Sequence, residues 1–126
     1  MLKKCKAETI LIIEDEADIQ KFVSRVLELE GYQVLQANDG ERGMEIIREN
    51  HVSLVLLDLR LPGRDGWSVL HDIRHATELA RIPVVVITAV AETIHRKRAL
   101  RMGANEYLIK PMSAHSLVQA IASILY

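Results

Sequence analysis

The stretch Leu54-Val55-Leu56-Leu57 is apolar at every position and is followed directly by Asp58. A strand has this pattern when helices cover both faces of a parallel sheet, because neither face then alternates with polar residues. Val84-Val85-Val86-Ile87 repeats the pattern and is followed by Thr88. The two stretches therefore predict neighbouring strands in the middle of a buried parallel sheet.

Shorter aliphatic runs and amphipathic stretches alternate along the rest of the chain. The first amphipathic stretch has one apolar stripe with helical spacing, and Gly31 is well placed to end that helix. Strands are predicted at Thr9–Ile13, Gln33–Ala37, 54–57, Val84–Thr88 and 107–109. Helices are predicted over about 19–27, 41–50, 66–73, 93–102 and 117–125.

Five β-α units in this order predict an α/β fold, since such alternation gives a parallel sheet with right-handed crossovers. The 126 residues are too few for an eight-fold barrel, which needs roughly 250 residues. We therefore expect a flavodoxin-like, doubly wound, three-layer (βα)5 domain with a five-stranded parallel sheet of order 2-1-3-4-5. It forms a single domain over 1–126, with a core over about 9–125.

The composition excludes several functional classes. Lys plus Arg (16) nearly balances Asp plus Glu (17), which argues against direct nucleic-acid binding. Cys5 is the only cysteine, so an internal disulfide is impossible and a reducing cytoplasm is favoured. No apolar run approaches the length of a membrane-spanning helix. We expect a cytoplasmic protein with no membrane partner.

Polar side chains follow four of the five predicted strands. They are Glu14-Asp15-Glu16, Asp58, Thr88-Ala89 and Lys110-Pro111. Parallel strands end at one edge of the sheet, and ligands bind at that edge. Crowded carboxylates favour Mg²⁺, a lysine and a hydroxyl can bind phosphate oxygens, and a carboxylate can act as a nucleophile. The pattern predicts Mg²⁺-dependent phosphoryl transfer onto an aspartate.

The same stretches resemble the receiver domain of two-component response regulators. The resemblance covers about Thr9 to Leu125 and rests on the sequences at 12–16, 57–66, 87–89 and 103–111. It implies that Asp58 accepts a phosphoryl group from a phosphohistidine, on a sensor histidine kinase or a histidine phosphotransfer protein. The domain would catalyse only its own phosphorylation and hydrolysis, so we do not expect an enzyme with a separate substrate.

The resemblance also implies roles for the other site residues. Asp15 and Asp58 would bind Mg²⁺ directly, Glu14 would hold it through water, and the backbone carbonyl of Arg60 would add a further ligand. Thr88, the Ala89 amide and Lys110 would bind the phosphoryl group, with Asp58, Thr88 and Lys110 as the catalytic residues. The Lys110–Pro111 bond is expected to be cis.

A switch and an output surface follow from the same resemblance. Tyr107 would turn inward when Thr88 moves to the phosphate. The signal would then reach a downstream effector through the surface of the fourth helix, fifth strand and fifth helix. Arg60 and Val90 depart from the common pattern and are expected to tune the lifetime of the phosphoryl group, in a direction that the sequence does not give.

Two alternatives to a phosphorylated receiver remain open. An unphosphorylated pseudo-receiver would lack a site residue, but Asp15, Asp58, Thr88 and Lys110 are all present. A haloacid-dehalogenase-type phosphatase would carry Asp-x-Asp after the first strand, where this chain has Glu14-Asp15-Glu16. The last residues have no glycine stop and no basic last turn, so the chain could also be the N-terminal part of a longer regulator.

Residues 71–75, His-Asp-Ile-Arg-His, echo the helix of a zinc protease, with two histidines four residues apart. The general base of that motif is a glutamate, and here the position holds the shorter Asp72. His71, Arg74 and His75 lie opposite the apolar face of the predicted helix. A solvent-exposed helix surface is therefore the better interpretation.

Overall fold

The computed structural model describes residues 8–89 and 92–126, and within them strands and helices alternate along the chain. The strands are β1 (Thr9–Ile13), β2 (Gln33–Ala37), β3 (Leu54–Asp58), β4 (Val84–Thr88) and β5 (Glu106–Ile109). The helices are α1 (Ala17–Leu29), α2 (Gly40–Glu49), α3 (Gly66–His75), α4 (Thr93–Arg101) and α5 (Ala114–Leu125). Cys5 and Val90 lie outside the described residues.

The strands form one parallel sheet in the order β2-β1-β3-β4-β5. This order confirms the predicted flavodoxin-like topology. In the register of the sheet, Ile13 pairs with Leu57, Asp58 with Ile87, and Thr88 with Ile109. The polar residues at the four strand ends therefore reach the same edge.

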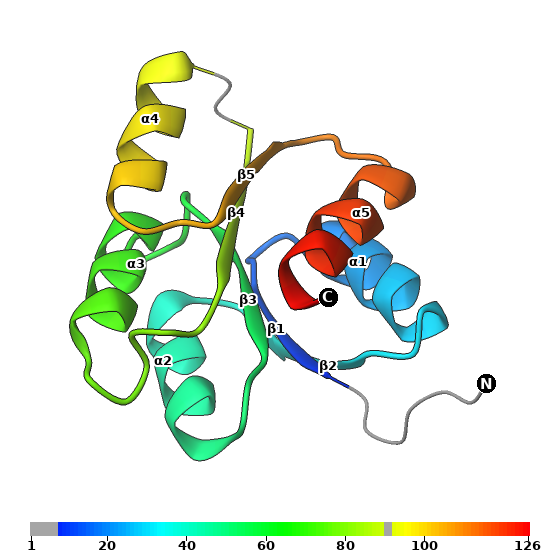
Figure 1. The fold of residues 1–126 in the computed structure, drawn as a ribbon, viewed down its shortest axis with the longest axis horizontal. Coiled ribbons are helices and arrows are strands. Elements are labelled where there is room, and N and C mark those ends of the chain that lie inside the picture. The colour runs from blue at the N-terminus through cyan, green and yellow to red at the C-terminus, as the bar shows by residue number, and fades with distance from the viewer. Residues whose placement is uncertain (1–7, 90–91) are drawn as a thin grey trace.

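Helices cover both faces of the sheet, with α2, α3 and α4 on one side and α1 and α5 on the other (Figure 1). Alternate residues of each central strand enter the two cores. Val55 and Val86 belong to the core beneath α2, α3 and α4, whereas Leu54 and Val85 belong to the core beneath α1 and α5. Every residue of β3 and β4 is buried for this reason.

The start of α3 packs directly on the end of β3. Asp65 caps the helix by accepting a hydrogen bond from the Ser68 amide at 2.9 Å. At Gly66 there is no room for a β-carbon against the carbonyl oxygen of Asp58 and the Cα of Leu59. Glycine at this position therefore permits the close approach that fixes Asp58 relative to α3.

No helix within residues 8–89 and 92–126 is long and apolar enough to cross a membrane.

Arg74 is half-buried rather than exposed on the helix surface, contrary to the interpretation of the 71–75 stretch. Its guanidinium donates hydrogen bonds to the carbonyl oxygens of Gly103 (2.9 Å) and Ile82 (2.6 Å) and to Oδ1 of Asn105 (2.9 Å). Helical periodicity placed the residue opposite the apolar face of the helix. The long side chain then turns inward and joins α3 to the loops that precede β4 and β5.

We expect Arg74→Met to lower the free energy of unfolding by about 2 kcal/mol, because several backbone and side-chain acceptors lose a charged donor. Urea unfolding followed by circular dichroism measures the change. Arg25→Met, an exposed position on α1, is the matched control and should change stability by less than about 0.5 kcal/mol. Equal stability of the two variants would contradict the bridging role of Arg74.

Candidate functional site

An ammonium group and three carboxylates meet at the carboxyl edge of the sheet. The Nζ atom of Lys110 lies 2.7 Å from Oε1 of Glu14, 3.0 Å from Oδ2 of Asp58 and 3.0 Å from Oε1 of Glu16. Glu14 and Asp58 are buried, whereas Glu16 is exposed. Three strand ends, those of β1, β3 and β5, thus deliver charged groups to one small volume.

Backbone amides fix the two buried carboxylates. Oδ1 of Asp58 accepts a hydrogen bond from the Arg60 amide at 3.0 Å, and Oε2 of Glu14 accepts one from the Glu16 amide at 3.1 Å. In each case the donor lies two residues further along the chain. The tight turns after β1 and β3 therefore hold the carboxylates in place and leave their other oxygens directed at Lys110.

Burial makes the charge of Glu14 costly. Removal from water raises the pKa of Glu14 to about 7, although the hydrogen bonds from Lys110 and the Glu16 amide act in the opposite direction. Burial alone would lower the pKa of Lys110, but its contacts with Glu14, Asp58 and Glu16 outweigh that effect and raise it. Lys110 therefore stays charged near neutral pH, whereas Glu14 holds its proton more tightly than an exposed glutamate.

The carboxylates fit a divalent cation. Ligand oxygens of Glu14, Glu16 and Asp58 all lie within 4.8 Å of one another, the only such acidic group among residues 8–89 and 92–126. One ammonium cannot balance three ionised carboxylates, and hard oxygen ligands suit Mg²⁺. The excess of carboxylates over the single ammonium makes this group suited to bind a divalent cation.

A pocket of about 270 Å³ opens above this group. Six residues line it, namely Asp15, Glu16, Asp58, Arg60, Ala89 and Lys110. Five of them were expected at the site from the sequence. Asp15 is exposed in the wall of the pocket and is not part of the close group of Glu14, Glu16 and Asp58.

The remaining predicted residues lie on β4 and β5 or directly after β5. Thr88 ends β4 with a fully buried side chain, and its carbonyl oxygen accepts a hydrogen bond from the Lys110 amide at 2.8 Å. Tyr107 is buried in the core beneath α2, α3 and α4, where burial raises the pKa of its phenol. The Lys110–Pro111 bond is cis, as expected.

Two residues of the site were not assigned a role from the sequence. Glu16 was seen only as part of an acidic run, yet it contacts Lys110, which is distant from it in the sequence. Gln20 is buried on α1, and its amide donates to the carbonyl oxygens of Glu14 and Ala37 and to Oδ1 of Asn38. Gln20 could have been predicted as a site residue because it is a polar residue among the apolar residues of its helix.

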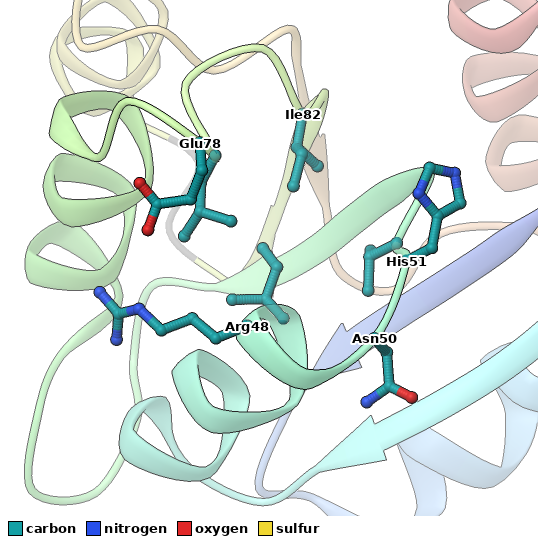
Figure 2. A pocket seen from close by; sticks show the side chains of 8 residues that line it. Arg48, Asn50, His51, Glu78 and Ile82 are labelled. Carbon is teal, nitrogen blue, oxygen red and sulfur yellow. The ribbon is translucent and has the colours of Figure 1, made fainter.

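A larger pocket of about 390 Å³ lies at the opposite edge of the sheet, between the end of α2 and the loop after α3 (Figure 2). Arg48 and Glu78 stand on one side of its mouth and His51 on the other (Figure 2). Its floor is apolar, and none of its lining residues belongs to the acidic group. The residues that could bind a metal or a phosphoryl group therefore lie at the smaller pocket and not at the larger one.

The strand order and the acidic carboxyl edge define a doubly wound α/β domain whose site is built from strand ends. The family model described as the response regulator receiver domain matches residues 10–122. The chain belongs to this family and is a receiver domain of a two-component system.

Individual relatives agree with this assignment. The chain is 37% identical over 119 residues to the phosphate regulon transcriptional regulatory protein PhoB of Escherichia coli K12, covering 94% of this chain and 52% of PhoB. It is 36% identical over 118 residues to the "Probable transcriptional regulator ycf27" of Porphyridium aerugineum, covering 94% and 48% of the two chains. The chain thus spans about half the length of the curated relatives it matches.

A solved structure gives the same assignment. The receiver domain of a sensor histidine kinase from Pseudomonas aeruginosa PAO1 superposes with a TM-score of 0.84 at 30% identity, covering 95% of this chain and 98% of that one. Its description includes a magnesium ion coordinated in the active-site cleft.

Proposed function

We propose that Asp58 accepts a phosphoryl group from a phosphohistidine on a sensor histidine kinase or histidine phosphotransfer protein, in a reaction that requires Mg²⁺. The observation that carries this proposal is the carboxylate of Asp58, nearly buried at the end of β3, paired with Lys110 and grouped with two further acids. A carboxylate oxygen of Asp58 bonds to phosphorus as the bond from phosphorus to the histidine nitrogen breaks. That nitrogen keeps the electron pair.

The acids at this edge would hold the metal. Glu14, Asp15, Asp58 and the carbonyl of Arg60 are our proposed ligands, directly or through water, and bound Mg²⁺ would neutralise the charge that develops on the phosphoryl oxygens. Asp58 and Glu14 belong to the close acidic group, and Asp15 and Arg60 stand beside Asp58 or line its pocket. Glu16, which contacts Lys110 at 3.0 Å, would give up that contact when Lys110 turns to a phosphoryl group.

The opposite wall would bind the phosphoryl group. Lys110 is charged and already lies 3.0 Å from Asp58. The Thr88 hydroxyl and the Ala89 amide follow β4 at the same edge, and Ala89 lines the pocket. We assign these three groups to the phosphoryl oxygens, with Thr88 and Tyr107 as the pair whose movement changes the surface of α4, β5 and α5.

The surface of α4, β5 and α5 would carry the signal to an effector. Among its exposed residues are Ile94 on α4 and Ile109 on β5, and α4 carries the basic side chains Arg96, Lys97 and Arg101 on its exposed faces. The relatives named as transcriptional regulators are about twice as long, which supports an effector domain or protein as the recipient of the signal.

Intact-protein mass spectrometry after incubation with acetyl phosphate and Mg²⁺ tests the proposal. We expect one added phosphoryl group on the native chain, and none when the metal is chelated or when Asp58 is replaced in Asp58→Asn. Asp18→Asn, an exposed aspartate on α1, is the matched control and should be labelled like the native chain.

Equal labelling of Asp58→Asn and the native chain would show that Asp58 is not the acceptor. If no adduct appears at all, binding of the stable phosphoryl mimic beryllofluoride, followed by fluorine NMR, separates rapid hydrolysis from an inert site. Absence of beryllofluoride binding as well would leave an unphosphorylated interaction module.

A further inference from the structure

Two histidines on α3 form a pair that the proposed function does not use. His71 and His75 are both exposed, and their rings stack with centroids 4.0 Å apart and an angle of 21° between the ring planes. Neither residue lines the pocket at Asp58. Residues four apart lie on the same face of a helix, so the two imidazoles project side by side from α3.

The hydrogen bonds of the pair determine which nitrogen carries the proton. Nδ1 of His75 lies 2.7 Å from the carbonyl oxygen of His71, and Nδ1 of His71 lies 3.2 Å from Oδ1 of Asp72. A carbonyl oxygen and a carboxylate can only accept, so in each neutral ring Nδ1 carries the hydrogen. Both Nε2 atoms are then left with a free lone pair, and neither has a protein partner among the described residues.

We propose that the Nε2 atoms of His71 and His75 together bind one divalent ion of the late first transition series, Cu²⁺, Ni²⁺ or Zn²⁺. Imidazole suits these ions, whereas Mg²⁺ prefers oxygen ligands. This site would therefore select a different ion from the acidic group at Asp58.

The surroundings of His71 support this assignment. A ligating histidine commonly donates its other ring N–H to a carboxylate or a backbone carbonyl, which orients the ring and strengthens the metal bond. His71 makes the first of these contacts and His75 the second. Asp72 is itself held by an ion pair with Arg64, so its carboxylate is a fixed support behind His71.

The coordination would be open to water. Among the described residues, no third histidine or acidic ligand joins the pair at metal-binding distance, so the ion would take its other ligands from solvent. Zinc–nitrogen bonds are about 2.0–2.1 Å long, so the nearly parallel rings must tilt toward each other at their Nε2 edges. Exposed imidazoles can make this rotation because their terminal torsion is soft.

The fluorescence of Trp67 can be used to measure metal binding at this pair. It is the only tryptophan, and it lies on α3 one turn before His71. We expect Ni²⁺ to quench its fluorescence with one-to-one stoichiometry when excess Mg²⁺ is present to occupy the acidic group. His71→Asn and His75→Asn should each weaken the apparent affinity by at least tenfold, and Asp72→Asn by about tenfold.

His115→Asn, an exposed single histidine on α5, is the matched control and should leave the Ni²⁺ affinity unchanged. Zn²⁺, which does not quench, should compete with Ni²⁺ in the native chain and restore the fluorescence. The proposal is overturned if the double variant His71→Asn/His75→Asn binds Ni²⁺ as tightly as the native chain, or if His115→Asn weakens binding equally. Neither outcome depends on phosphorylation of Asp58.

Discussion

Lys110→Met should destabilise the Mg²⁺-free protein by about 3 kcal/mol at pH 8, because removal of one partner leaves buried carboxylates without a counter-charge. Lys110 Nζ contacts Glu14, Glu16 and Asp58 within 3.0 Å. Both Glu14 and Asp58 are buried, so water screens little of the resulting repulsion. Methionine keeps most of the length of the side chain and removes only the ammonium group.

Urea unfolding with a chelator present measures this loss, and a second series in Mg²⁺ tests its origin. A bound divalent cation would replace the missing positive charge, so Mg²⁺ should recover a large part of the lost stability. Lys97→Met, at an exposed lysine on α4, is the matched control and should change stability by less than about 0.5 kcal/mol. If Mg²⁺ gave Lys110→Met no more stability than it gives the control, electrostatic repulsion would not be the cause.

The sheet could be predicted from sequence because its strands are short and apolar on both faces. A doubly covered parallel sheet accommodates the fully apolar runs at 54–57 and 84–87, and β3 and β4 are indeed fully buried. The observed bounds of two strands differ from the predicted ones. β3 extends by one residue to Asp58, and β5 begins one residue early at Glu106.

The location of the site followed from the same reasoning. Parallel strands bring their carboxyl ends together whatever the side chains do, and this alone gathers Glu14, Asp58, Thr88 and Lys110 at one edge. The sequence does not determine which of the neighbouring acids contacts the ammonium group of Lys110. Glu16, not Asp15, closes the group around Lys110, because the turn after β1 sets the direction of each side chain.

The length of an arginine side chain explains why one surface prediction on α3 was wrong. Arg74 was expected in solvent on α3, yet it donates to the loops before β4 and β5. Hydrophobic periodicity considers only where a residue is attached to the helix. An arginine extends far enough from that point to satisfy carbonyl oxygens that lie beyond it.

Glu14→Gln should have the opposite effect from Lys110→Met and should stabilise the Mg²⁺-free protein above pH 7. Burial raises the pKa of Glu14 from 4.5 to about 7, so folding favours the protonated side chain. The contribution of the protonated Glu14 side chain to the stability of the fold is fully present below pH 4.5. It falls as the pH rises and is lost above about pH 7. Since each pKa unit corresponds to about 1.4 kcal/mol, the neutral variant should gain up to about 3 kcal/mol at pH 8.

Two measurements test whether the buried carboxylate of Glu14 serves to bind a cation at the expense of stability. In urea unfolding with a chelator, the native protein should lose stability between pH 5 and 7, whereas Glu14→Gln should lose less and Glu49→Gln, at an exposed acid on α2, should follow the native protein. Added Mg²⁺ should then stabilise the native protein more than Glu14→Gln, because a glutamine amide is a weaker ligand than a carboxylate. A variant that is more stable without the metal and gains less from it would show that the buried charge is retained for binding rather than for folding. Identical pH profiles for Glu14→Gln and the native protein would mean that Glu14 is ionised in the folded state without cost.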